Sequence, residues 1–438
     1  MSGGQKGLAV AEEACLHTVT PTGGSRLGRW WPTALCLWLG FVALGLVALM
    51  AVERAGEPGF DFRYFWLAGQ LWADGISPYG STFTEAGARL ISEGHVPLIW
   101  PYPPNMWLPT LLLAPFDLPT AWHLWLCLDL VALPAASALL AFGLPSGRVP
   151  GGEGWQSLRL RRLDVFGLHL ALMATIETVQ LSLYVGQLSF FIYLGAALLV
   201  TGLAEGRGGR AVAGLTILCL KPQIGAVVVL ALMISGRGGL RLAVRAVVVC
   251  ILLTIPPTLT KPAAILDWLH SVGSYDGVAF ANLPLAMSGI RHLVWASAGL
   301  DMGNLAAMAA TLAVGAGISL HGRRSILPER GDSGLAASDQ AVIALLVVLA
   351  LAPLHIYDFT LFGVVVFTLA GSRRFGLALG LLGAAFCLRP SDLQIWLENG
   401  GPVSLFPGTT LATWGALFML VAALLPRGRS GSGHRTSA

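Results

Sequence analysis

Long runs of apolar residues, separated by short polar or turn-forming clusters, dominate the chain. Several runs reach about 17 to 25 residues, the length that a helix needs to cross roughly 30 Å of hydrocarbon. Inside a bilayer every backbone N–H and C=O needs a partner, so runs of this length favour helices over the short alternating strands of a barrel. The pattern predicts an all-α, polytopic bundle of membrane helices.

The order of apolar runs and arginines predicts about ten membrane crossings. The first run, 30–52, follows Arg26 and Arg29, so the positive-inside rule places the amino terminus in the cytoplasm. The later crossings are expected at 120–143, 164–183, 188–203, 242–258, 304–320, 341–356, 358–371, 375–388 and 409–425. The arginine-rich loops then fall on the cytoplasmic side, as the rule requires.

This topology divides the chain into a membrane domain and two tails. Residues 1–29 and 427–438 are expected to be disordered cytoplasmic tails, and residues 30–426 form the membrane domain. The largest outer segment is 53–119. Any chemistry is therefore expected at the outer membrane face, or in a cavity that opens to it.

Two shorter elements are expected within the outer segment 53–119. Aromatic and apolar residues recur at helical spacing over 62–72, which is typical of an amphipathic helix at the membrane interface. The run 100–116 holds five prolines, and proline lacks the backbone donor that a helix needs. This run is predicted to be a re-entrant element rather than a straight crossing.

Composition agrees with a membrane protein and excludes several other classes. Of the 438 residues, 55% are hydrophobic and 11% are charged, against about 25% charged in soluble domains. The net charge is only +4, so no nucleic-acid partner is expected. The six cysteines are scattered without metal-ligand spacing, and no nucleotide-binding, metalloprotease or serine-hydrolase motif is present. Neither a metal nor a cofactor is expected.

Asp61 is the first candidate for chemistry, because it is a carboxylate in an aromatic outer segment shortly after the first crossing. A carboxylate there can accept a proton from a substrate hydroxyl. Two other interpretations stay open, a solvated loop charge and an N-cap for a helix that begins at Phe62.

Lys221 is the second candidate. Lys221-Pro222 interrupts the apolar run 211–235, which predicts a hairpin of two half-helices. A charge in mid-membrane costs roughly 2.5 to 3.5 kcal/mol on insertion scales and usually marks a partner or a ligand, here an anion. The alternative is that the lysine snorkels to an interface.

Other polar residues are weaker candidates. His355, Tyr357 and Asp358 form a polar cluster between two apolar runs, where the alternative is a plain turn between helices. Gln187 in YVGQLSFF could instead cap or join two helices, and Tyr102 in WPYPPN could instead be an aromatic residue at the membrane interface. Three further residues of outer loops are candidates for contact with an anionic group: Arg291, His292 and Arg389.

Five segments in a fixed order resemble one family of enzymes. They are DFRYFWLAGQLWADGISPYG, WPYPPNMWLPTLLLAPF, YVGQLSFFIYLGAALL, AGLTILCLKPQIGAVVVLALM and LAPLHIYDFTLF. Over residues 60–370 the chain resembles the polyprenol-phosphate-mannose-dependent mannosyltransferases of the GT-C superfamily. The motifs that carry the resemblance are Asp61-Phe62, Gly75-x-x-Pro78-Tyr79, Tyr102-Pro103-Pro104, Gly186-Gln187 and Lys221-Pro222.

The resemblance implies a GT-C fold and an inverting hexosyltransferase of a bacterial plasma membrane. Asp61 would be the catalytic base, and Lys221 would contact the phosphate of a polyprenyl-phosphate-linked donor. A hexose, mannose by resemblance, would move to a glycan or lipid acceptor at the outer face. The residues expected to bind the sugar or the acceptor are Tyr64, Tyr102, Gln187, His355, Tyr357 and Asp358.

Departures from the family pattern keep the sugar and the acceptor open. Leu188-Ser189 follows Gln187 where many members have an asparagine, and the motif 355–358 resembles one bacterial branch. A rival class is a transporter or lipid flippase that uses Lys221 and Asp358 as intramembrane charges without making a bond. A third is a catalytically silent scaffold. Asp61 discriminates the first two, because only a transferase needs it for turnover.

Overall fold

A computed structural model describes residues 30–91, 98–144, 161–275, 282–326, 333–366, 374–397 and 408–424. Within these ranges all regular structure is helical, which confirms the all-α membrane fold. Both predicted tails lie outside the described residues, so their disorder stays a prediction.

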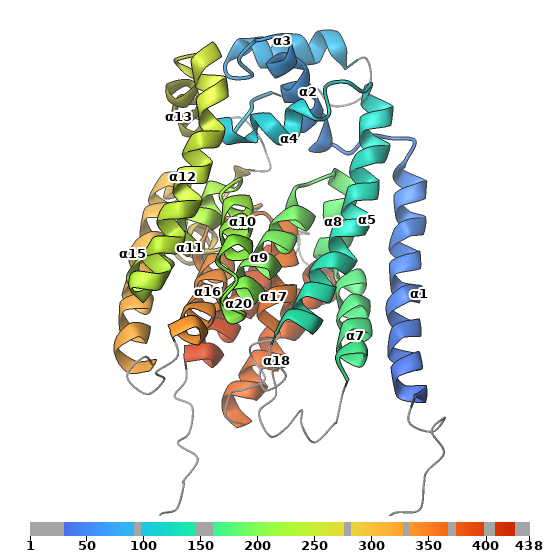
Figure 1. The fold of residues 1–438 in the computed structure, drawn as a ribbon, viewed down its shortest axis with the longest axis vertical. Helices are drawn as coiled ribbons and strands as arrows, with labels where there is room; N and C mark the ends of the chain where they lie inside the picture. The colour runs from blue at the N-terminus through green and yellow to red at the C-terminus, as the bar shows by residue number, and fades with distance from the viewer. Residues whose placement is uncertain are drawn as a thin grey trace, which may run out of the picture.

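Most helices run side by side as a bundle (Figure 1). They are α1 (Trp31–Arg54), α5 (Leu118–Gly143), α7 (Arg162–Thr175), α8 (Glu177–Val185), α9 (Ser189–Ala204), α10 (Gly208–Leu218), α11 (Pro222–Ser235), α12 (Arg237–Thr260), α15 (Gly303–Ile326), α16 (Ser333–Leu351), α17 (Phe362–Val366), α18 (Arg374–Leu388) and α20 (Thr409–Leu424). Two short helices, α14 (Ile290–Ala298) and α19 (Pro390–Leu397), pack beside α20.

A separate group of helices lies across one end of the bundle, at the top of Figure 1. It is called the end layer here, and its members are α2 (Phe62–Ala73), α3 (Ser81–Leu90), α4 (Trp107–Leu111) and α13 (Ala264–Ser274). The amphipathic helix predicted over 62–72 is α2. The proline-rich run 100–116 forms only a 3-10 turn, Pro104–Met106, and the short α4, so it contains no straight crossing.

Four of the described helices are long and apolar enough to cross a membrane: α1, α5, α12 and α15. The pair α7 and α8 makes a fifth candidate, and seven shorter apolar segments of 10 to 17 residues complete the set. The chain is therefore a polytopic helical membrane protein. The count of about ten crossings and their orientation stay predictions.

Helix breaks agree with the sequence where proline makes them and differ where it does not. The predicted break at Lys221-Pro222 separates α10 from α11. The run 164–183, predicted as one crossing, bends by 61° because Ile176 is extended between α7 and α8. Two other predicted crossings differ at their ends. Helix α16 stops at Leu351, before 356, and the described part of 358–371 is a 3-10 helix followed by α17.

Close backbone contacts hold several helix pairs together. A Cβ added to Gly214 of α10 would clash with the Gly195 carbonyl oxygen of α9. A Cβ added to Gly40 of α1 would lie 2.6 Å from the Gly167 carbonyl oxygen of α7. Only glycine allows this approach. Small residues at helix contacts are typical of membrane bundles, where packing rather than water exclusion drives association.

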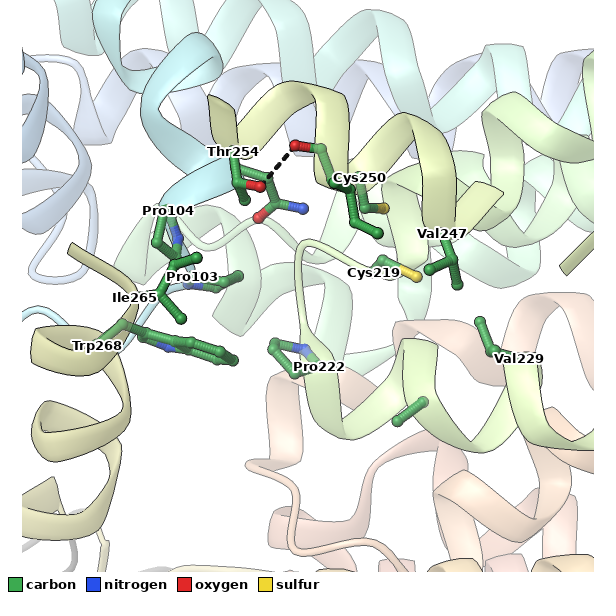
Figure 2. Close-up of a pocket in the computed structure, with 13 residues that line it drawn as sticks. Pro103, Pro104, Cys219, Pro222, Val229, Val247, Cys250, Thr254, Ile265 and Trp268 are labelled. Carbon is green, nitrogen blue, oxygen red and sulfur yellow. Dashed lines mark hydrogen bonds between the residues drawn. The ribbon is translucent and has the colours of Figure 1, made fainter. Parts of the chain in front are cut away.

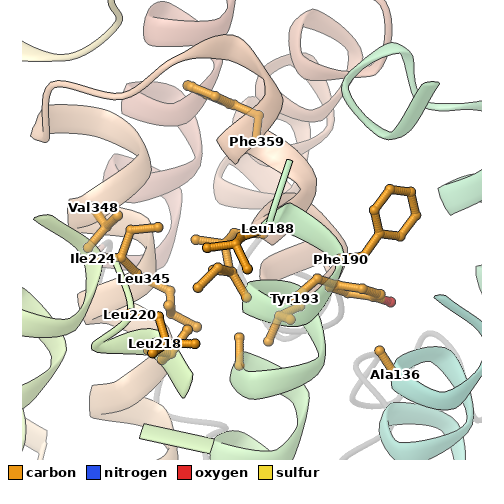
Figure 3. Close-up of a cluster of buried hydrophobic side chains, with 14 of the residues drawn as sticks. Ala136, Leu188, Phe190, Tyr193, Leu218, Leu220, Ile224, Leu345, Val348 and Phe359 are labelled. Atoms are coloured by element: carbon orange, nitrogen blue, oxygen red, sulfur yellow. The ribbon is translucent and has the colours of Figure 1, made fainter. Parts of the chain in front are cut away.

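The buried core connects α9, α10, α11, α16 and the 3-10 helix Ile356–Leu361 (Figure 3). Leu220 and Ile224 flank Lys221 in this core, and Phe359 follows Asp358. The two charged residues therefore lie in an apolar environment, where an unpaired charge is costly.

Candidate active site

Asp61 occupies the N-cap position of α2, but its side chain does not cap the helix. Its Oδ2 instead accepts a hydrogen bond from Nε2 of Gln187 at 2.7 Å. Its backbone N–H donates to the Val185 carbonyl at 2.8 Å. The carboxylate is partly buried, and it lies in the end layer outside the membrane-spanning helices. The side chain is therefore neither a fully solvated loop charge nor a hydrogen-bonding cap of α2, although the residue lies at the N-cap position.

Two glycines let the loop before α2 approach the end of α8. Gly186 ends α8 in the left-handed conformation, with φ of 73°, and a Cβ there would lie 2.6 Å from Cβ of Phe62. A Cβ on Gly59 would lie 2.6 Å from the Val185 carbonyl. Any larger residue at either position would separate the two segments. This contact is the physical reason for glycine before Gln187.

The orientation of the Gln187 amide follows from its neighbours. Its Oε1 accepts from the Leu188 backbone N–H at 3.2 Å and from the Tyr102 hydroxyl at 3.2 Å. A backbone N–H can only donate, so the atom facing Leu188 is the carbonyl oxygen. The amide nitrogen must then face Asp61. Gln187 is buried, with 3% of its surface exposed.

Side-chain donors hold the irregular segment that carries Tyr102. Prolines lack a backbone N–H and prevent a regular helix here, so the carbonyls need other partners. The carbonyls of residues 100–102 accept, in order, from Ser271 at 2.7 Å, Trp268 at 3.0 Å and Tyr79 at 2.8 Å. The segment is thus fixed by α13 and by the tyrosine of the Gly-x-x-Pro-Tyr motif.

Lys221 and Asp358 form a buried ion pair between Nζ and Oδ1. Their exposed fractions are 2% and 1%, so Lys221 does not snorkel and Asp358 is not in a solvated turn. The Lys221 ammonium also lies 5.0 Å from the ring centroid of Tyr357. The second Asp358 oxygen, Oδ2, is buried and has no hydrogen-bond partner among the described residues.

Electrostatic interactions join the two groups into one site. Burial raises the pKa of Asp61 to about 6, while the Gln187 hydrogen bond and the Lys221 charge act to lower it and the Asp358 charge to raise it. Both carboxylates also act on Tyr357. The centroid of the Tyr357 ring is 5.1 Å from that of His355.

The remaining candidates divide into neighbours of the site and structural residues. Tyr64 is half-buried next to Asp61, with its ring 5.9 Å from that of Phe83. Arg291 is 1% exposed and makes two 2.8 Å contacts to Asp301, so its guanidinium is committed to the fold. His292 is equally committed, since both ring nitrogens have hydrogen-bond partners.

Tyr275, at the end of α13, lies near the site and was not among the sequence candidates. Its hydroxyl interacts electrostatically with Asp61, Tyr64 and Asp358. The surrounding residues GSYDG form no distinctive pattern, so the only available signal was its place in an outer segment.

An apolar groove of about 390 Å³ adjoins this site (Figure 2). Its walls come from the proline-rich segment, the α10–α11 connection, α12 and α13. Pro103 and Pro222 line it, and each directly follows a residue of the site in sequence. Its lining is almost wholly apolar. The other lining residues are Pro104, Asn105, Cys219, Ala226, Val229, Val247, Cys250, Ile251, Thr254, Ile265 and Trp268.

Fold and site together define a class, a polytopic membrane protein with a carboxylate and a buried ion pair beside an apolar groove. The sequence profile of Glycosyltransferase family 87 matches residues 100–353, more than half of the chain. The chain belongs to glycosyltransferase family 87. Searches of the curated proteins and of the solved structures gave no match.

Family membership confirms the prediction of a glycosyltransferase and argues against the transporter alternative. Tyr102, Gln187 and Lys221 lie inside the matched range, whereas Asp61 and Asp358 lie outside it.

Proposed function

We propose that the chain is an inverting GT-C-type hexosyltransferase of a bacterial plasma membrane. It would move a hexose, with mannose as the first choice, from polyprenyl phosphate to a glycan or lipid acceptor at the outer face. The observation that carries the proposal is the combination of a partly buried base, Asp61, with the buried cation Lys221 in one electrostatic site. The end layer would face outward, and the two tails would lie in the cytoplasm.

Asp61 acts as the base in this proposal. Its carboxylate takes the proton of the acceptor hydroxyl as that oxygen attacks the anomeric carbon. The bond from the anomeric carbon to the phosphate oxygen breaks on the opposite face, and polyprenyl phosphate leaves with the electron pair. A pKa of about 6 leaves Asp61 ionised at neutral pH yet more basic than an ordinary aspartate.

Lys221 stabilises the leaving phosphate. An ammonium group has three N–H donors, and the ion pair with Asp358 uses one of them. The others remain for the phosphate as its negative charge develops. Asp358 compensates the buried cation when no donor is bound, so the site does not hold an isolated charge.

The apolar groove supplies a place for the start of the prenyl chain. Its lining offers hydrocarbon contacts and almost no polar atoms, which suits an isoprenoid. Because Pro103 and Pro222 lie next to Tyr102 and Lys221, a chain in the groove would bring its phosphate toward the lysine. Tyr64, His355 and Tyr357 would contact the sugar or the acceptor.

The decisive experiment measures transfer of radiolabelled hexose from polyprenyl-phosphate donors to endogenous acceptors in membranes. Donors carrying mannose, glucose and galactose are compared, beginning with mannose. We expect Asp61→Asn to reduce transfer by about 100-fold or more at equal protein. Asp74→Asn is the matched control, since Asp74 is an exposed aspartate at the other end of α2. Wild-type activity in Asp61→Asn would refute the base, and no transfer by the wild type from any of these donors would refute the function.

A further inference from the structure

We propose that Gln187, Tyr102 and Tyr79 form a positioning chain that holds the carboxylate of Asp61, rather than contacts for the sugar. This inference rests on the proposed function, because it assigns Asp61 as the base. It also changes the role expected for Tyr102 and Gln187, which were predicted to bind substrate. These side chains are already engaged in hydrogen bonds with one another and with Asp61.

Gln187 has little capacity left for a ligand. A carbonyl oxygen has two lone pairs, and its Oε1 already accepts from Tyr102 and from the Leu188 backbone. One amide N–H is donated to Asp61 at 2.7 Å. Only one N–H remains, on a side chain that is 3% exposed. A sugar hydroxyl that donates to Oε1, or that takes the N–H bonded to Asp61, would have to displace an existing partner.

Tyr102 is held at both of its polar ends. Its hydroxyl donates to Gln187, and its carbonyl accepts from the hydroxyl of Tyr79, which is 5% exposed. Its ring packs 5.0 Å from that of Phe65 and 4.9 Å from that of Trp100. Three motifs that are far apart in the sequence thus form one continuous chain that ends on Asp61.

The chain has a chemical consequence at Asp61. One carboxylate oxygen, Oδ2, is fixed by Gln187, which leaves Oδ1 to take the proton of the acceptor. The hydrogen bond favours the ionised form and so acts to lower the pKa of Asp61. Among the described residues, the other titratable groups that interact with this carboxylate are Lys221, Asp358, Tyr64, Tyr102, Tyr275 and Tyr357. Substitution of Gln187 removes none of these groups but takes away the acceptor of the Tyr102 hydroxyl, so Tyr102→Phe is measured beside it.

The test compares Gln187→Met, Tyr102→Phe and Tyr79→Phe with Gln180→Met, a glutamine on α8 outside the chain. We measure initial transfer rates from radiolabelled polyprenyl-phosphate-mannose, or whichever hexose donor the wild type uses, against pH and donor concentration. In Gln187→Met the acid limb of the plot of transfer rate against pH should move about one pH unit upward. The maximal rate should fall about tenfold or more, with KM for the donor within about twofold. In Tyr102→Phe and Tyr79→Phe the acid limb and the maximal rate should change in the same direction by smaller amounts. In Gln180→Met neither should change.

A direct titration separates failure of this inference from failure of the proposed function. Infrared difference spectra report the protonated carboxyl band of Asp61, which is assigned by its loss in Asp61→Asn. The midpoint should be higher in Gln187→Met than in the wild type, whether or not transfer is detected. An unchanged midpoint, or a raised KM with an unchanged acid limb, would overturn the positioning role. If Gln187→Met does not fold, Tyr102→Phe removes a single hydroxyl and decides the same question.

Discussion

Lys221 and Asp358 depend on each other, because each is almost completely buried among apolar side chains. Removing one partner leaves an uncompensated charge, whereas replacing both with apolar residues is often tolerated. The pair therefore separates stability from function: the fold requires only that the charges balance, and the proposed chemistry requires the lysine itself.

Substitutions of this pair should show that separation. We expect Lys221→Met and Asp358→Leu each to cost about 3 to 5 kcal/mol of stability, and the double variant to recover most of it. None of the three should transfer sugar at a normal rate. Thermal unfolding in detergent and transfer in membranes are the measurements. A single variant as stable as the double variant would contradict the pairing.

The pKa of Asp61 gives a second prediction, in which activity and stability change in opposite directions with pH. Transfer should rise as pH rises through about 6, because only the ionised carboxylate accepts a proton. The folded-state pKa of about 6 lies above the ordinary aspartate pKa of 3.8, so the folded state binds more protons than the unfolded chain between these values. The stability contribution of Asp61 therefore falls as pH rises from about 4 to about 6. Comparing the thermal unfolding midpoints of wild type and Asp61→Asn at each pH isolates this contribution. If the midpoints of both proteins depended on pH in the same way, the raised pKa of Asp61 would be refuted.

Sequence predicted the unusual residues better than it predicted their partners. Asp61, Lys221 and Asp358 were evident because charges stand out in aromatic or apolar surroundings. Their contacts were not: Gln187 is 126 residues from Asp61, and Asp358 is 137 residues from Lys221. The sequence suggested an anionic ligand for Lys221, and the structure provides a carboxylate of the same chain. Pairing across such separations depends on how helices pack, which no local pattern contains.

At the scale of elements, proline marked the breaks that the sequence could predict. The segment 100–116 and the Lys221-Pro222 break contain it, and both were predicted. The bend at Ile176 has no proline. There the Thr175 hydroxyl bonds to carbonyls of the preceding turn, and Glu177 of α8 accepts from the Ser391 backbone at 2.9 Å. The bend therefore depends on a hydroxyl that bonds within its own helix and on a contact with a distant segment, and no proline marks it in the sequence.

Glycine at helix contacts supports a third prediction. Gly214→Ala places a methyl group against the backbone of α9, so we expect a loss of about 1 to 3 kcal/mol. Gly209→Ala is the control on the same helix, since a Cβ there meets nothing within 4 Å. It should be neutral or slightly stabilising, because alanine favours helix. Thermal unfolding of both variants is the measurement, and equal midpoints would argue against the close α9–α10 contact.

At the scale of the whole molecule, the end layer and the bundle each contribute part of the site. Asp61 and Tyr102 come from the segments that lead into α2 and α4 of the end layer, Lys221 and Asp358 from breaks between bundle helices, and Gln187 from the turn after α8. Because the helices are interrupted at these residues, polar side chains from several elements meet in one site. In uninterrupted transmembrane helices these residues would lie at different depths and would not contact one another.

The apolar groove allows this arrangement to be tested with substrates of different length. Val247 and Val244 both lie on α12, but only Val247 lines the groove, and Val244 is 49% exposed on the outside of the bundle. Val247→Trp should fill part of the groove and raise KM for a long-chain polyprenyl-phosphate donor about tenfold, which corresponds to about 1.4 kcal/mol of lost binding. Val244→Trp adds the same bulk to the outer surface and should leave KM unchanged.

Chain length provides the internal control for that experiment. A donor with a very short prenyl chain makes few contacts along the groove, so it should bind wild type and Val247→Trp with similar KM. The ratio of the two KM values therefore reports hydrocarbon contacts in the groove, independently of any effect on Asp61 or Lys221. If Val247→Trp impaired both donors equally, the groove would not be the site of the prenyl chain, and the substitution would be acting on the fold near the Lys221 turn instead.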